Sequence, residues 1–374
     1  MSSSKEIGNG YALPKKTRIN DKNFLTPAMM LTYSFRVNNP KPWLEIPNCS
    51  IMTNAYDILQ NGRLEKEVRE HGIHEKLGLI SEVCAMDSGG FQFITKGEGE
   101  KIDPVAILDL QIASGVDIAV GLDYPILMNH TNEEAALFTN KSLQNIELAY
   151  KSIKNGTEVM PVLHGTSAKE IASYFNKVKK IGDFKIYGVG GLVPQMQQRN
   201  TSHKRYFNII DRVFEARQQL NSLDDNILLH LFGVGSPLAG LLFLLAGADS
   251  IESISWIMNA KYFLVYQDKY GARKVSQKTT MVTTPVKWDE YECRCPICKD
   301  QDLKEIEQLM KISGNDGFRN RAMHNAFVYQ RILYNARAAI RENRLMEFCE
   351  EQLGSHRFFK GILKYTKEKL QNCL

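Results

Sequence analysis

The sequence has few cysteines, a small net charge and no long apolar run, and each shortage excludes a class of protein. No apolar run reaches the roughly 18 residues that a membrane-spanning helix requires. The cysteine count is seven, an odd number, and the chain begins with polar residues instead of an apolar signal segment. Both observations indicate a reducing compartment rather than a disulfide-stabilised secreted protein. We therefore expect a cytoplasmic protein in which residues 1–20 form a flexible leader.

The net charge of the 374-residue chain is only +5, which is a weak indication of an anionic partner. The distribution of charge is more informative, because six arginines and a single acid, Glu342, occur from Arg319 to Arg344. Further basic residues follow, namely Arg357, Lys360, Lys364, Lys367 and Lys369. Such a stretch is either a solvated helix face or a surface for a phosphate backbone. Both interpretations stay open at this point.

Three of the seven cysteines are clustered. Cys293, Cys295 and Cys298 lie within six residues, and His324 follows after 25 intervening residues. Three thiolates and one imidazole are the four ligands that a closed tetrahedral Zn²⁺ site needs. A disulfide or free thiols would not require such clustering in a chain this poor in cysteine. The spacing therefore predicts a structural zinc site.

Short apolar runs alternate with amphipathic segments before the cysteine cluster. The runs, which we predict as strands, are residues 51–54, 83–88, 118–122, 159–163, 186–189, 228–232 and 248–253. The segments with apolar residues at three- and four-residue spacing, predicted as helices, are residues 105–114, 133–154, 169–180, 204–220 and 237–246. This alternation predicts an α/β protein with a parallel sheet, and a closed TIM-type (β/α)8 barrel is the commonest form at this length.

An open doubly wound sheet is the alternative fold, but no Gly-rich phosphate fingerprint follows the first predicted strand. We place the barrel in residues 21–285, and a zinc-binding subdomain with basic C-terminal helices in residues 286–374. In such a barrel, functional groups lie where strands end. Six predicted strand ends combine polar or acidic residues with glycines, at residues 86–92, 121–125, 163–165, 188–194, 231–237 and 247–253. Glycine and aspartate are ordinary turn formers, but six such loops at one edge predict a ligand site.

From Asn54 to the helix after His324, the chain resembles the tRNA-guanine transglycosylases and their DNA-acting relatives. The motifs that carry this resemblance are DSGGFQ (87–92), GVGGL (188–192), FGVGSP (232–237), the cysteine spacing and HNAF (324–327). The resemblance implies a zinc-bearing barrel that replaces guanine in a nucleic acid by a free 7-deazaguanine. It also implies a covalent intermediate between an enzyme carboxylate and C1′ of the sugar.

By this resemblance, Asp87 transfers protons to and from the bases, although an aspartate can also simply cap the turn that follows it. The nucleophile is ambiguous, because the family pattern Gly-x-Asp-x-Phe-Asp is represented here by GADSIE, residues 247–252. The register places Glu252 at the position of the nucleophile, and Asp249 is the alternative. Side chains alternate along a strand, so only one of these two acids can face the pocket. We favour Glu252.

The resemblance also implies a base pocket. Phe91 and Phe232 would stack on the two faces of the purine, unless both rings are part of the core. Asp123 would accept hydrogen bonds from N1 and the exocyclic amine of the base, and His164 stands where the family usually has glutamine. The remaining predicted base contacts are Ser88, Gly190, Gly191 and Leu192.

Departures from the tRNA-acting pattern bear on the substrate. Residues 253–258 read SISWIM and lack the arginine that meets the anticodon loop in the bacterial tRNA enzymes, and Met196 replaces a glutamate. No RNA-binding domain of the archaeosine-forming type fits in the remaining residues. We therefore predict exchange of guanine in DNA for a preQ0-like base, in a bacterium or a phage-infected cell. The alternatives are a tRNA-acting enzyme and an inactive nucleic-acid-binding subunit, and the family suggests a homodimer.

Overall fold

The computed structural model describes residues 8, 10–12, 15–36, 39–90, 102–154, 156–196, 202–279, 281 and 283–373. Within these residues, a parallel sheet has the strand order β7-β6-β5-β4-β3-β11-β10-β9-β8. The strands are β3 (Ala28–Thr32), β4 (Ser50–Asn54), β5 (Cys84–Asp87), β6 (Ile118–Val120), β7 (Glu158–Met160), β8 (Val162–Leu163), β9 (Ile186–Val189), β10 (Leu228–Leu231) and β11 (Ser250–Ser253). Only Pro161 separates β7 from β8, so the sheet closes as an eight-stranded barrel. The predicted fold class is confirmed.

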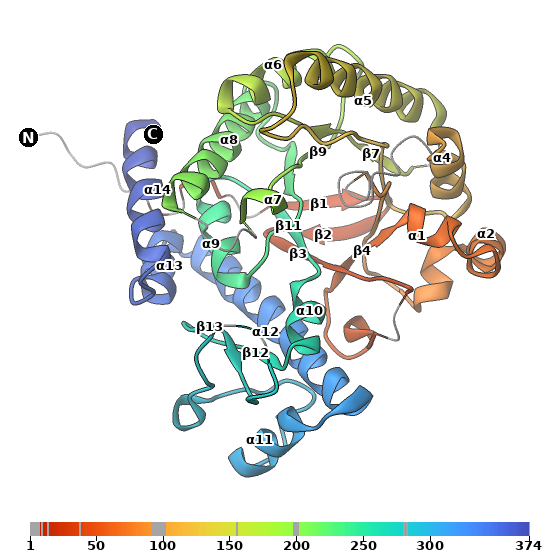
Figure 1. Cartoon of the computed structure of the whole chain (residues 1–374). Coiled ribbons are helices and arrows are strands. Elements are labelled where there is room, and N and C mark those ends of the chain that lie inside the picture. Colours follow the sequence, from red (N-terminus) through yellow and green to blue (C-terminus); the bar gives the residue numbers. More distant parts are fainter. Residues whose placement is uncertain are drawn as a thin grey trace, which may run out of the picture.

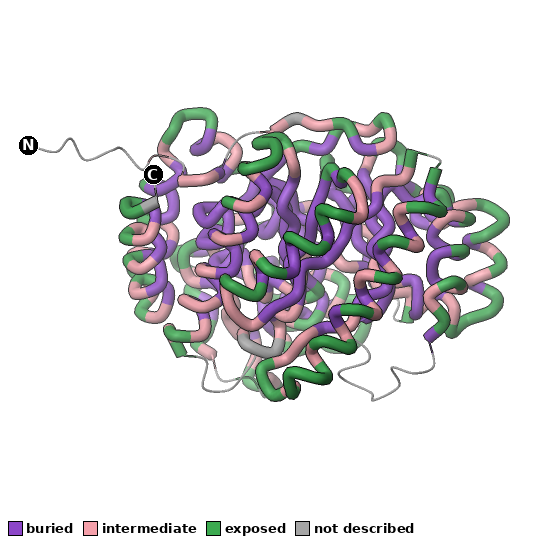
Figure 2. Tube along the Cα trace, turned by 90° about the horizontal axis from the view of Figure 1, so that it is seen from above, coloured by how far each residue is buried: buried purple, intermediate pink, exposed green. Residues whose placement is uncertain are grey.

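Both faces of the barrel strands are buried, which explains why their sequences are continuous apolar runs. Met30, Ala85 and Val162 pack inside the barrel, whereas their neighbours Leu31, Met86 and Leu163 pack outward against the helices. Figure 2 shows the buried chain in the centre and the exposed segments on the outer turns of the helices. One strand, β3, is missing from the predicted set, because its sequence AMMLT has no β-branched residue before its last position.

A hairpin closes the barrel at the N-terminal ends of the strands. Its strands are β1 (Lys16–Ile19) and β2 (Lys22–Leu25), joined by Asn20 and Asp21, which both have positive φ. Ile19 and Phe24 join the cluster inside the barrel. We expected the flexible leader to extend to residue 20, but β1 begins at Lys16. The last residue of this strand, Ile19, is buried inside the barrel and holds the strand in place.

Helices surround the strands (Figure 1). They are α1 (Ala55–Leu59), α2 (Gly62–Leu77), α4 (Pro104–Ala113), α5 (Asn132–Ser152), α6 (Ala168–Val178), α7 (Val193–Met196), α8 (His203–Asn221), α9 (Pro237–Leu245) and α10 (Ser255–Lys261). The five predicted helices correspond to α4, α5, α6, α8 and α9. Capping side chains fix their starts: Asp103 and Ser236 each accept from a backbone N–H and precede a proline, and Thr131 forms a capping box.

A smaller unit projects from the barrel below α10 (Figure 1). It contains the hairpin β12 (Leu264–Gln267) and β13 (Gly271–Lys274), the short helix η3 (Trp288–Glu290), and α11 (Leu303–Lys311). Val265 and Val275 share one hydrophobic cluster with Cys295, Cys298 and Ile306. The boundary predicted at residue 285 therefore differs from the structure, in which the hairpin before it packs with the zinc ligands.

The chain then returns to the barrel. Helix α12 (Gly314–Arg341) packs on α10 and β3, and α13 (Leu345–Leu353) and α14 (Phe359–Cys373) pack on α9, with α14 also contacting α8. These C-terminal helices share the main hydrophobic core with the barrel, although we grouped them with the zinc-binding subdomain in residues 286–374. None of the described helices is long and apolar enough to cross a membrane.

Candidate active site and metal centre

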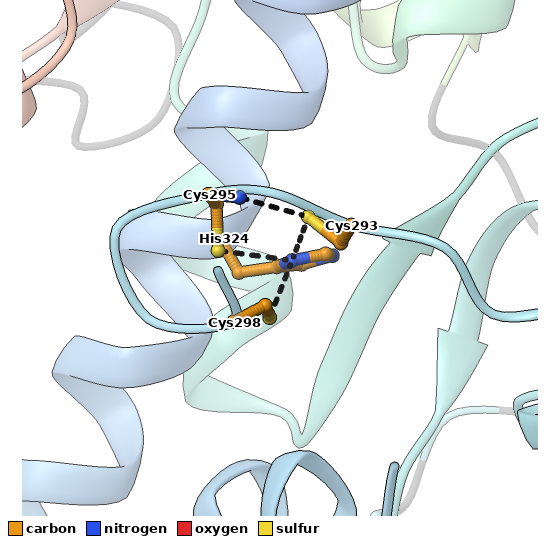
Figure 3. Close-up of side chains that lie close together, drawn as sticks. All are labelled: Cys293, Cys295, Cys298 and His324. Carbon is orange, nitrogen blue, oxygen red and sulfur yellow. Dashed lines mark hydrogen bonds between the residues drawn. The ribbon is translucent and has the colours of Figure 1, made fainter. Parts of the chain in front are cut away.

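The four predicted zinc ligands lie together (Figure 3). The sulfurs of Cys293, Cys295 and Cys298 are 3.4, 3.7 and 3.9 Å from Nδ1 of His324. All four ligand atoms lie within 4.8 Å of one another. A tetrahedral Zn²⁺ with ordinary bond lengths would hold sulfur and nitrogen about 3.6 Å apart. The spacing of the ligand atoms therefore fits zinc.

The second nitrogen of His324 fixes the orientation of the ring. Nε2 lies 2.8 Å from the carbonyl oxygen of Tyr266, so the ring proton resides on Nε2 and the lone pair of Nδ1 faces the thiols. His324, Cys295 and Cys298 are buried. Four protein ligands leave no position for a water molecule, so the group can hold a structural and not a catalytic zinc.

Two carboxyl groups occupy the C-terminal end of the barrel. Asp87 is the last residue of β5, and Glu252 lies near the end of β11. Ile251 packs outward in the main core, so its neighbour Glu252 points into the barrel. The Glu252 carboxyl accepts from the backbone N–H of Gly233 at 2.5 Å and from the hydroxyl of Thr32. Burial raises the pKa of Glu252, and these two hydrogen bonds oppose the shift.

Asp87 is held by Asn54, whose amide donates at 3.0 Å, and by the backbone N–H of Gly89 at 3.2 Å. Burial and the negative charges of Asp123 and Glu252 raise the pKa of Asp87 to about 8. Asp87 is therefore protonated near neutral pH and can donate a proton. Two carboxyl groups with different surroundings, one able to donate a proton and one held in place by two donors, are what a stepwise exchange at a glycosidic carbon needs.

Asp249, the other predicted nucleophile, lies in a different environment. Its Oδ2 accepts from Lys15 at 3.3 Å, from the backbone N–H of Leu229 at 2.8 Å, and from the guanidinium of Arg217. Asp249 precedes β11 and is 4% exposed. The carboxylate of Asp249 is thus ion-paired with Lys15 and Arg217, and it lies at the N-terminal end of the barrel, away from Asp87.

The predicted base contacts gather around Asp123. His164 Nε2 lies 2.7 Å from one carboxylate oxygen of Asp123, and the Ser88 hydroxyl lies 3.4 Å from the other. His164 is buried, and its Nδ1 has no partner among the described residues. A Cβ on Gly90 would lie 2.2 Å from Asp123 Oδ1, which explains the glycine at this position.

The GVGGL segment forms the C-terminal end of β9, the strand next to β8. The Gly190 carbonyl accepts from buried Arg212 at 2.8 Å, Gly191 has a φ of 70°, and Leu192 is buried. A Cβ on Gly188 would lie 2.4 Å from the ring of Phe232, so the glycine makes room for this ring. Phe232 is half-buried above the barrel interior. The other predicted stacking residue, Phe91, lies outside the described residues.

Several residues of this site were not predicted from the sequence. Thr32 and Asn54 end β3 and β4 as polar residues after apolar runs, which is the signal that could have identified them. Arg212 is a charged residue on the buried face of α8. His230 interrupts the apolar run of β10, and its Nδ1 lies 2.8 Å from the Ser250 hydroxyl.

The basic stretch from residue 319 onward is largely used within the protein. Arg321 donates to three backbone carbonyls, Arg337 donates to the Pro27 carbonyl at 2.7 Å, and Arg331 pairs with Asp268 at 2.8 Å. Lys367 and Lys369 also pair with acids. The positive charges of Arg321 and Arg337 are bound within the fold, so neither earlier interpretation describes them, whereas Lys367 lies on a solvent-exposed helix face.

The described fold is thus a (β/α)8 barrel with two carboxyl groups at its C-terminal end and a Cys3His group that could hold zinc. The family model described as queuine tRNA-ribosyltransferase matches residues 15–357, and the chain belongs to this family. The predicted superfamily is thereby confirmed, while the DNA-acting branch has no support from this match.

Curated relatives of the chain include archaeal proteins named tRNA-guanine(15) transglycosylase. The protein of Methanocaldococcus jannaschii is 29% identical over 90% of this chain and 49% of its own length. The proteins of Methanococcus aeolicus and Thermococcus onnurineus are each 27% identical, over 91% and 94% of this chain and 50% and 57% of their own lengths. The chain thus spans about half the length of the curated relatives it matches.

Proposed function

We propose that this chain exchanges guanine in a nucleic acid for a free 7-deazaguanine base, with Glu252 as the nucleophile and Asp87 as the proton-transfer residue. The main support is the difference between the two acids of the GADSIE segment. Glu252 points into the pocket and is held by two neutral donors, whereas Asp249 is occupied by Lys15 and Arg217.

The exchange has two steps. In the first, a Glu252 oxygen attacks C1′, the bond from C1′ to the guanine breaks with its electron pair on the base, and protonated Asp87 supplies a proton to the departing base. In the second, a nitrogen of the entering base attacks C1′, the ester bond to Glu252 breaks, and the proton from that nitrogen returns to Asp87. The two carboxyl groups thus end each cycle in their starting states.

Glu252 has one methylene more than the aspartate of the family pattern, which moves its oxygens by roughly 1.5 Å. The hydrogen bonds from Thr32 and Gly233 fix the longer side chain in one orientation. Such fixation supports a nucleophile, because attack requires the oxygen at one defined position relative to C1′.

Recognition of the base is assigned to the carboxylate of Asp123. It can accept from the N1–H and the exocyclic amine of a guanine-like ring, a pair of donors that adenine does not present. Ser88 and His164 orient this carboxylate, and Phe232 supplies one stacking face. The second face is assigned to Phe91 and remains a prediction from the sequence.

For the nucleic acid, the names of the relatives favour tRNA over the DNA that we predicted from the sequence. DNA stays a second candidate on one observation, the SISWIM segment that replaces the arginine-containing segment of bacterial tRNA enzymes. Residues 255–258 of this segment start α10, beside β12 and α12. A homodimer stays a prediction.

The test is to incubate the protein with guanine-containing tRNA or DNA of matched length and to search for an adduct that survives denaturant. We expect an adduct on tRNA that is chased by free 7-deazaguanine and is absent in Glu252→Gln. Adducts on DNA alone would move the substrate to the second candidate. An adduct that persists in Glu252→Gln would contradict the assignment of the nucleophile.

A further inference from the structure

A cavity of about 290 Å³ lies between the start of α9, the hairpin β12–β13 and the turn that joins α13 to α14. Ser236, Tyr270, Arg273 and His356 contribute polar groups to its wall. No acidic side chain is among the described residues that line it. The mechanism above makes no use of these residues.

Arg273 supplies the positive charge of the cavity. Its guanidinium lies over the ring of Tyr270, 4.8 Å from the ring centre, and its buried Nε has no hydrogen-bond partner among the described residues. Arg273 also forms no ion pair within the part of the chain that the structure describes. Hydrogen bonds from Lys287 and Tyr270, together with the charge of Arg273, lower the pKa of Glu290. This carboxylate is thus already bonded to two other residues. An unpaired guanidinium offers a fork of donors that suits a phosphate.

His356 adds a neutral donor. Its Nδ1 accepts from the backbone N–H of Phe359 at 3.4 Å, so its proton resides on Nε2. Burial and the nearby charge of Arg273 lower the pKa of His356, which keeps the ring neutral. An arginine, an imidazole N–H and hydroxyl groups without a carboxylate make a wall that attracts an anion.

The cavity is close to the reacting carbon. Ser236 lies three residues after Gly233, whose N–H binds the Glu252 carboxyl. Three residues of extended chain span at most about 11 Å. One or two nucleotides of a bound strand cover such a distance, so a phosphate beside the target nucleotide can reach the cavity while C1′ faces Glu252.

We propose that Arg273 and His356 bind a backbone phosphate of the nucleic acid next to the nucleotide whose base is exchanged. The phosphate accepts from the guanidinium of Arg273 and from Nε2–H of His356. This inference rests on the proposed function for the position of C1′. It assigns a strand contact to residues outside α12 and α14, in which Arg331, Lys367 and Lys369 are paired with acids.

The test compares Arg273→Ala with Arg63→Ala, a control that removes one positive charge from exposed α2 on the other side of the barrel (Figure 1). Binding of labelled tRNA and DNA is followed by fluorescence anisotropy from 50 to 200 mM salt. We expect Arg273→Ala to weaken binding about tenfold. We also expect the slope of log K against log salt to become shallower by about 0.7–0.9, the value of one phosphate contact.

Neutral methylphosphonate linkages, placed one at a time on either side of the target guanosine, identify the phosphate. One position should weaken binding to the wild-type protein and to Arg63→Ala but have no further effect in Arg273→Ala. His356→Ala should also weaken binding, because it removes a contact to the phosphate at the same position. Thermal melting checks that each variant is folded. Equal behaviour of Arg273→Ala and Arg63→Ala, or no binding by the wild-type protein, would overturn the inference. Adduct formation in the same samples tests the proposed function separately, because binding does not require Glu252 to react.

Discussion

The two ends of the barrel use buried acids in opposite ways. At the N-terminal end, Asp117 accepts from Lys22 at 2.9 Å, from His74 at 2.8 Å and from the backbone N–H of Cys84 at 2.8 Å. Burial alone would raise the pKa of Asp117, but the hydrogen bonds from His74, Cys84 and Lys22 outweigh it and lower the pKa. At the C-terminal end, the pKa of Asp87 is raised to about 8, because burial and the charges of two further acids act in the same direction.

The difference shows which acids stabilise the fold and which are available for chemistry. Paired acids such as Asp117 and Asp249 fix the strands and the hairpin that closes the barrel. Acids gathered without cations lower stability, and such an arrangement is expected where proton transfer and attack occur. The comparison therefore predicts that equivalent substitutions at the two ends affect different properties.

The largest effect is expected from Glu252→Gln, which keeps the shape of the side chain and removes the attacking charge. Base exchange should fall by at least about 10⁴-fold, since the covalent route is lost. The matched control is Glu158→Gln at the N-terminal end, where the carboxylate pairs with Lys185 at 2.5 Å. The rate of incorporation of labelled base measures both variants. Comparable losses in the two variants would remove the distinction between the ends of the barrel.

Glu252→Asp refines this result. It restores the shorter acid of the family pattern, but the oxygens can no longer reach Thr32 and Gly233 and C1′ in the same way. Because a displacement of about 1 Å can cost about 100-fold in rate, we expect exchange near that fraction of the wild-type rate, with the adduct still detectable. A faster exchange in Glu252→Asp would show that the two hydrogen bonds do not position the nucleophile.

The second prediction concerns stability at the N-terminal end. Asp249→Ala leaves Lys15 and Arg217 buried without their carboxylate, and breaking such a buried pair typically costs about 3–5 kcal/mol. Urea denaturation measures the loss. The control is Glu70→Ala, which breaks an exposed pair with Lys66 on α2 and should cost less than about 1 kcal/mol. Equal free energies of unfolding for the two variants would mean that Asp249 does not stabilise the barrel.

The sequence carries much of this organisation but not all of it. Seven of the eight barrel strands were predicted from apolar runs. The zinc ligands were predicted from the spacing of three cysteines and one histidine, because residue type and spacing alone indicate a metal site. The roles of Asp87 and Asp123 were predicted from the family resemblance, and both residues lie at predicted strand ends that combine acids with glycines. The preference for Glu252 rested on its register against the family pattern, and alternation along a strand indicated only that one of Glu252 and Asp249 can face the pocket. Their different partners became visible only in the folded chain.

The partners escaped the sequence analysis for a physical reason. Lys15 and Arg217 lie 234 and 32 residues from Asp249, and no local pattern reports such contacts. Thr32 was missed together with β3, whose methionines carry little strand propensity. The basic stretch was misleading because composition does not distinguish an exposed arginine from one that donates to buried carbonyls, as Arg321 does.

The third prediction compares how acids at the two ends of the barrel make the free energy of unfolding depend on pH. The folded pKa of Asp87 lies above its unfolded value of about 3.9, so the folded state keeps a proton that the unfolded state releases. The free energy of unfolding should therefore fall as pH rises from about 4 to 8. Asp117, with its lowered pKa, contributes stability above its unfolded pKa that is lost as pH falls through its lower folded pKa.

Urea denaturation of wild-type protein, Asp87→Asn and Asp117→Asn at pH 4, 6 and 8 measures these slopes. Asp87→Asn should flatten the decline between pH 4 and 8. Asp117→Asn should instead lower stability at all three values and leave that decline in place. A decline that is unchanged in Asp87→Asn would show that the carboxyl group of Asp87 is ionised in the folded protein.

The smallest effect is expected within the C-terminal end, where Asp123 recognises the base and touches no phosphate. Asp123→Ala should weaken binding of free 7-deazaguanine about ten- to 100-fold, because the donors of the base lose a charged acceptor. Binding of nucleic acid should change little, since phosphates supply most of its affinity. Ser88→Ala removes only the long 3.4 Å contact to Asp123 and serves as the matched control, with a loss of a few-fold at most. Isothermal titration with the free base and anisotropy with the nucleic acid separate the two affinities. Equal losses of both in Asp123→Ala would make Asp123 a structural residue, like Asp117 at the other end of the barrel.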